Sequence, residues 1–180
     1  MCRRSRPERR YLVCADWLNW RTCVRLSWSI AVNRIRLRFE RLQSVTGTLY
    51  SGDYSIRGLE DVFAIGRKSV DDLSACCLAG NRERFEHELH RLRGYRFKRL
   101  LICGSREDIA AGRYHSRIAP KAVLATLGAF EIRYDLPVVF AATPEAGARQ
   151  IERWTWWFAR EVVENGNDLL RGCKIAEELA

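Results

Sequence analysis

The chain has 180 residues, and because domains usually contain about 100–200 residues, one folded domain accounts for its length. Hydrophobic residues make up 47% and charged residues 29%, a balance that excludes a disordered chain and a disulfide scaffold. No apolar run approaches the ~20 residues of a membrane-spanning helix. We therefore expect a soluble protein with no membrane partner, and seven cysteines without a CxxC pair favour a reducing cytoplasm.

The positive charge is concentrated near the N-terminus. The formal net charge is +9, of which residues 1–50, with 11 Arg, no Lys and three acidic residues, contribute +8. Such a basic segment usually indicates nucleic acid or another acidic partner. However, this segment has no steady periodicity and no signal-peptide pattern, and its Trp and Cys content argues against a transit peptide. We treat residues 1–38 as an atypical N-terminal segment.

Regular patterns begin at residue 39 and alternate between the two types of secondary structure. In chain order, we expect strands over 39–49, 54–56 and 62–65, a helix from Ser69, a helix over 81–95, a strand over 100–103, a short helix over 106–111, a helix from Pro120, a strand over 136–141, and a long helix from Pro144 to about 165–166. The alternation predicts an α/β domain, and a hairpin over 54–65 makes its sheet mixed.

Charged residues flank this hairpin in an ordered pattern. Gly52 and Asp53 precede it, and Gly66-Arg67-Lys68 follows it, with three residues between Lys68 and Asp72. The pattern resembles the catalytic segment of the XPF family of structure-specific DNA endonucleases, a Gly-Asp turn followed by Glu-Arg-Lys, three residues and Asp. The resemblance covers residues 39–165. It implies a restriction-endonuclease-like mixed sheet flanked by helices, and metal-dependent hydrolysis of phosphodiesters in branched or flapped DNA.

The residue types suit that chemistry, because phosphodiester cleavage needs carboxylates that hold Mg²⁺ or Mn²⁺ and a cation near the phosphate. The resemblance implies that Asp53 is a metal ligand, that Lys68 is the stabilising cation, and that Arg67 holds a phosphate or braces the site. In a hairpin, Asp53 can lie beside residue 66, with Lys68 facing the same way. Each residue also has a structural explanation: Asp53 suits a turn, Asp72 completes a capping box with Ser69, and Arg67-Lys68 suits a solvated strand end.

Two departures from the family pattern bear on activity. Gly66 stands where the family has its Glu, which removes a carboxylate from the expected metal site. The family's upstream Asp-x-Arg-Glu strand end is absent from residues 1–50. Codons permitted for Ser29–Arg36, read one base earlier, can encode Asp-Cys-Arg-Glu-Pro-Asn-Pro. We therefore hypothesise that residues 1 to about 37 are a frameshifted translation, which the nucleotide sequence of the gene tests.

Basic residues in and after the helix over 81–95 are candidates for contact with the DNA backbone, namely Arg82, Arg84, Arg96 and Lys98. Interleaved acidic residues predict that about half of such basic residues form solvated ion pairs. The helical spacing of Trp154 and Trp157 predicts that both lie in the core instead of stacking on bases.

Three hypotheses for function follow. The first is a metal-dependent DNA endonuclease impaired by Gly66. The second is a catalytically inactive member that binds DNA or a partner protein, and the third is a damaged gene product. Family members commonly act as dimers, so a homodimer or a partner subunit is expected, and the tail at 166–180 is too short for the helix-hairpin-helix module that family members commonly carry.

Overall fold

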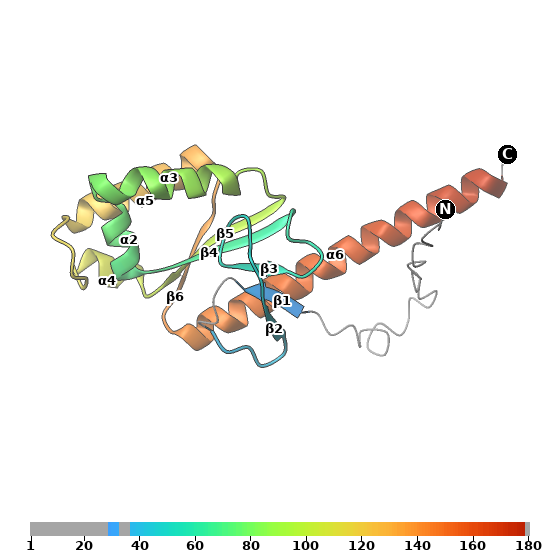
Figure 1. Cartoon of the computed structure of the whole chain (residues 1–180), viewed down its shortest axis with the longest axis horizontal. Coiled ribbons are helices and arrows are strands. Elements are labelled where there is room, and N and C mark those ends of the chain that lie inside the picture. The colour runs from blue at the N-terminus through green and yellow to red at the C-terminus, as the bar shows by residue number, and fades with distance from the viewer. Residues whose placement is uncertain (1–28, 33–36, 179–180) are drawn as a thin grey trace, which may run out of the picture. The chain divides into compact units, whose positions relative to one another are not determined.

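The computed structural model describes residues 29–32 and 37–178 (Figure 1). Residues 28–160, which contain the sheet, form one compact unit, and the C-terminal part of the chain from residue 161 is not part of it. The expected features of residues 1–28 and 33–36 lie outside the described residues.

A six-stranded mixed sheet forms the centre of residues 28–160, in the order β2-β1-β3-β4-β5-β6 (Figure 1). The strands are β1 Ser29–Val32, β2 Gln43–Thr46, β3 Tyr54–Ile56, β4 Phe63–Ser69, β5 Phe97–Cys103 and β6 Val138–Ala141. β3 and β4 form the expected antiparallel hairpin, while β4, β5 and β6 are parallel. The α/β class with a mixed sheet is therefore confirmed.

Helices supply the crossovers that parallel strands require. They are α2 Val70–Cys76, α3 Ala79–Leu92, α4 Arg106–Ala110, α5 Pro120–Tyr134 and α6 Pro144–Glu178. The expected capping box at the start of α2 is present, because the Ser69 hydroxyl accepts from the Asp72 N–H at 3.0 Å and Asp72 Oδ2 accepts from the Ser69 N–H at 3.4 Å. No helix of the described residues has an apolar stretch long enough to cross a bilayer.

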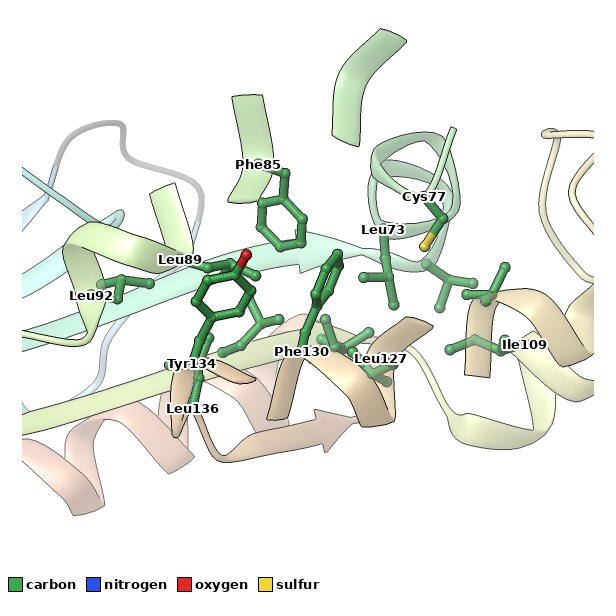
Figure 2. Packing of buried hydrophobic residues seen from close by; sticks show 14 of the residues in the cluster. Leu73, Cys77, Phe85, Leu89, Leu92, Ile109, Leu127, Phe130, Tyr134 and Leu136 are labelled. Carbon is green, nitrogen blue, oxygen red and sulfur yellow. The ribbon is translucent and has the colours of Figure 1, made fainter. Parts of the chain in front are cut away.

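The core under α3 has the composition that its sequence pattern predicts. Phe85, Leu89 and Leu92 are all buried. They pack with residues of α2, α4, α5 and the sheet, and Figure 2 shows Phe85 of α3 facing Phe130 of α5. The two rings are 5.7 Å apart in an edge-to-face arrangement. This packing fixes the rotation of α3 about its axis, which decides where the polar residues of the helix point.

Aromatic side chains cover the opposite face of the sheet. Phe63 of β4 and Phe97 of β5 stack at 4.5 Å, and Phe158 of α6 contacts both rings. Successive strand residues alternate between the faces, so Phe63 and its alternate neighbours face α6. Gly66 and Lys68 therefore face the layer of helices that contains α3.

Several sequence expectations differ from the structure. The strand expected over 39–49 shortens to β2, and the sheet also contains β1, which lies before residue 39 and buries Ile30 and Val32 completely. The helix expected to stop at 165–166 continues to Glu178. Its Asn-Gly pair is not followed by proline, so nothing forces the backbone to leave the helix.

The two tryptophans expected in the core behave differently. Trp154 is half-buried and its ring lies 6.0 Å from that of Phe97. Trp157 is 54% exposed, so its placement in the core was wrong. The buried stripe of α6 follows Ile151 and Thr155, and Trp157, two positions beyond Thr155, lies about 200° around the helix from it.

Candidate functional site

A pocket of about 340 Å³ lies where the β3–β4 hairpin meets α2 and α3. It contains equal numbers of acidic and basic side chains, and its lining residues are Asp53, Arg67, Lys68, Asp72, Ala75, Cys76, Asn81, Arg84, Phe85 and Glu88. Five residues that the sequence singles out, Asp53, Arg67, Lys68, Asp72 and Arg84, thus lie around one cavity. The strand-end position is the usual place for ligand sites in α/β sheets.

The Gly52-Asp53 turn is docked tightly on β4. Gly52 has φ +79°, and a Cβ there would lie 3.0 Å from the Ile65 carbonyl oxygen, so the turn requires glycine. The Asp53 N–H donates to Ile65 O at 2.8 Å, and Asp53 Oδ2 accepts from the Arg67 N–H at 2.8 Å. These bonds to both neighbours of Gly66 fix Asp53 beside position 66.

Gly66 lies in a space that accepts a side chain. A Cβ at this position would lie 3.5 Å from Leu100 Cδ1, 3.8 Å from Leu92 Cδ1 and 3.8 Å from Glu88 Oε1. All three are ordinary van der Waals distances. The glycine is therefore not required by steric conflict.

Lys68 is held against α3. Its Nζ lies 3.2 Å from Glu88 Oε2, and the side chains of this ion pair are 20% and 22% exposed. The same ammonium lies 4.9 Å from the centroid of the Phe85 ring. Because this ion pair is partly buried, solvent and salt screen it less than they screen a surface pair. The attraction to Glu88 therefore orients Lys68 in the pocket.

Arg67 and Asp72 have structural contacts as well as a place in the pocket. The Arg67 Nε lies 3.2 Å from Cys103 Sγ on the neighbouring strand β5, which orients its guanidinium. Asp72 forms the capping box of α2, in agreement with the structural explanation for it. Its carboxylate therefore stabilises the N-terminus of a helix that lines the pocket.

The residues proposed from the sequence to contact DNA are dispersed. Arg84 is exposed and lines the pocket. Arg82 pairs with Glu86 at 2.8 Å, a bond that lowers the pKa of the Glu86 carboxyl. Lys98 pairs with Asp135 at 2.9 Å, which likewise lowers the pKa of that carboxyl.

Arg96 lies 5.5 Å from the centroid of the Phe158 ring, on the face of the sheet that α6 covers. In the described part of the chain, Arg82, Arg96 and Lys98 are not among the residues that line the pocket. Of the four DNA-binding candidates, only Arg84 therefore belongs to the candidate site.

A family model described as the ERCC4 domain matches residues 24–153. The chain belongs to the ERCC4 domain family. This is a nuclease family, so the XPF-type resemblance of the sequence motif is confirmed. No curated protein matches the chain.

Solved structures show the same fold as this ERCC4 domain. XPF from Aeropyrum pernix superposes with a TM-score of 0.59 at 18% identity, over 77% of this chain and 69% of that one. XPF from the same organism in complex with DNA superposes with a TM-score of 0.59 at 19% identity, over 74% of this chain and 66% of that one. The restriction-endonuclease-like sheet expected from the motif agrees with these matches.

Sequence reasoning missed Glu88, Asn81 and Cys76 as pocket residues. Glu88 is one of the acidic residues interleaved with the basic residues of its helix, for which the sequence predicts solvated ion pairs. Its spacing, three residues after Phe85 and four before Leu92, places it at the edge of the buried stripe, and that was the available signal. Burial raises the pKa of the Cys76 thiol, so this pocket residue is a neutral thiol at pH 7.

The carboxylates of the pocket fit a metal site that substrate phosphates complete better than a site made only of protein ligands. Within the described residues, no group of three or more His, Cys, Asp and Glu side chains is arranged to hold a metal ion. Mg²⁺, however, is usually bound by one or two carboxylates together with substrate phosphates. Asp53 and Glu88 are two carboxylates in a pocket that the cationic side chains of Arg67 and Lys68 also line.

Proposed function

We propose that this ERCC4 domain is a DNA endonuclease that depends on Mg²⁺ or Mn²⁺, hydrolyses phosphodiesters in branched or flapped DNA, and is slowed by the loss of a carboxylate at Gly66. One observation carries the proposal: Asp53 and Lys68, on either side of position 66, line a single pocket in a member of a nuclease family. The ERCC4 nucleases are generally dependent on divalent metal.

Each residue has a distinct role in this proposal. A bound metal ion supplies Lewis-acid polarisation of the phosphate and lowers the pKa of a bound water. Asp53 would hold the ion through its carboxylate, which the bond from the Arg67 N–H to Oδ2 keeps in place. Lys68 stabilises the negative charge that develops on the phosphate oxygens during attack. Arg67 braces Asp53 through its backbone and offers its guanidinium to a phosphate.

DNA is the substrate that this chemistry and the comparisons support. Arg67, Lys68 and Arg84 give the pocket three cations, which can neutralise backbone phosphates. The XPF structure from Aeropyrum pernix that contains DNA has the same fold. Because family members commonly act as dimers, we include a second copy or a partner subunit in the proposal.

A catalytically inactive member that binds DNA or a partner is the second candidate. The observation that favours it is the ion pair between Lys68 and Glu88, which engages the proposed catalytic cation in a site that lacks the motif carboxylate. Metal-dependent cleavage separates the two candidates.

Cleavage of a labelled flap or fork DNA with Mg²⁺ or Mn²⁺ tests the proposal. We expect slow cleavage by the chain as written, loss of cleavage in Asp53→Asn, and faster cleavage in Gly66→Glu. If folded Gly66→Glu protein cleaves nothing, the inactive candidate is favoured. Equal cleavage by the chain as written and by Asp53→Asn contradicts the role of Asp53.

A further inference from the structure

The carboxylate that strand β4 lacks has a counterpart on helix α3. We propose that Glu88 supplies the second carboxylate of the metal site, across the space that Gly66 leaves open. This inference rests on the proposed function, and it makes Glu88 a metal ligand that the sequence motif does not contain.

The first step is the position of the Glu88 carboxylate relative to the backbone of β4. Its Oε1 lies 3.8 Å from the place where a Cβ of residue 66 would be. A Glu side chain at position 66 would extend from that Cβ on the same face of the strand as Lys68. Glu88 therefore brings carboxylate oxygens to the region that the motif Glu would occupy.

The two carboxylate oxygens of Glu88 have different surroundings. Oε2 binds Lys68 Nζ at 3.2 Å, while Oε1 is the oxygen near position 66. The motif pairs a Glu and a Lys two residues apart on one strand face, and here the same pair of charges forms between a strand and a helix. Lys68 can keep its bond to Oε2 while Oε1 binds a metal ion.

Packing holds Glu88 in this position. Phe85 and Leu89, on either side of Glu88 along the helix surface, are 2% and 0% exposed, and they anchor α3 to the core (Figure 2). The Glu88 side chain is 22% exposed, whereas that of Glu83 on the same helix is 88% exposed. Glu88 is thus oriented before a ligand arrives, which lowers the entropy cost of binding.

The second ligand reaches the same position from the hairpin. Asp53 is bonded to the backbone of Ile65 and Arg67, the two neighbours of Gly66, and it lines the same pocket as Glu88. Two carboxylates that converge on residue 66, with phosphate oxygens as further ligands, match the usual ligand set of Mg²⁺.

A titration of the protein with Mn²⁺ tests the inference without relying on catalysis. Electron paramagnetic resonance measures the binding, because the signal of free Mn²⁺ decreases when the ion binds to the protein. The variants are Glu88→Gln, the matched control Glu83→Gln on the exposed side of α3, Asp53→Asn, Gly66→Glu, and the double variant Gly66→Glu/Glu88→Gln. Thermal melting of each variant verifies that the fold is retained.

We expect the chain as written to bind Mn²⁺ and Glu88→Gln to bind it at least ~10-fold more weakly, since even outer contacts of a metal site are worth 10–100-fold in affinity. Glu83→Gln leaves the affinity unchanged, and the double variant restores it. If Glu88→Gln binds as well as the chain as written while Asp53→Asn does not, the inference is wrong and the proposed function stands.

Two further outcomes are also decisive. Binding that appears only when Gly66→Glu is introduced overturns the role of Glu88 and supports an impaired nuclease. Absence of binding in every folded variant, Gly66→Glu included, overturns the inference together with the metal dependence of the proposed function.

Discussion

The carboxylate of Asp53 accepts a hydrogen bond from the backbone N–H of Arg67 at 2.8 Å, which ties the turn before β3 to the end of β4. This bond, with the one from the Asp53 N–H to Ile65 O, sets the carboxylate beside position 66. A site fixed by strand register is held more accurately than one carried by a loop.

Removal of the Lys68 ammonium should slow DNA cleavage. In Lys68→Met the apolar stem remains over Phe85, but the charge that stabilises the phosphate is lost, and such donors are worth ~10²–10³ in rate. Single-turnover cleavage of flap DNA with Mn²⁺ measures the effect, with Lys121→Met on the exposed side of α5 as the control. Equal rates in the two variants would falsify the role of Lys68.

Alanine at Gly66 should stabilise the fold. The position has room for a Cβ and does not need positive φ, so Gly66→Ala should raise the free energy of unfolding by about 0.4–1 kcal/mol. Urea denaturation measures it. Gly52→Ala is the matched control and should be destabilising, because Gly52 has φ +79° and closely approaches Ile65 O. A destabilised Gly66→Ala protein contradicts the geometry described for the pocket.

Arg84 and Arg82 should differ in their effect on DNA binding. Arg84→Ala removes an exposed cation at the pocket and should reduce the salt dependence of binding by about one phosphate contact. Arg82→Ala should change it less, since Arg82 already pairs with Glu86. Fluorescence anisotropy of labelled fork DNA over a range of salt concentrations measures both, and identical slopes for the two variants would count against the pocket as the DNA contact.

The local features of the site could be predicted from the sequence. The capping box of Ser69 and Asp72 depends on residues three apart, and the hairpin brings Asp53 to residue 66 through a short connection. Such short-range patterns are readable without a structure. The motif therefore located one wall of the pocket.

The contribution of α3 could not be predicted in the same way. Glu88 contacts Lys68 and approaches position 66 because the buried residues of α3 dock the helix on the sheet. The helical pattern alone predicts a solvated ion pair for Glu88. The place of β1 between β2 and β3 is likewise decided by pairing between distant segments. Contacts between segments far apart in sequence leave little trace in any one window of residues.

The N-terminal hypothesis makes a prediction about the gene. β1 ends at Val32, which pairs with Tyr54, the residue after Asp53. A strand end that carries Asp-x-Arg-Glu would thus lie next to the candidate site. We propose that the nucleotide sequence over the codons for Ser29–Arg36 encodes Asp-Cys-Arg-Glu-Pro-Asn-Pro when read one base earlier; codons that forbid this reading exclude the frameshift.

Anomalous diffraction from a crystal of the chain as written, soaked in Mn²⁺, tests the central claim most directly. The account predicts one manganese peak in the pocket, within coordination distance of a carboxylate oxygen of Asp53 and of Glu88 Oε1. A fully soaked crystal with no peak in this pocket, or with manganese bound only elsewhere on the protein, would contradict a metal-dependent nuclease site at Asp53.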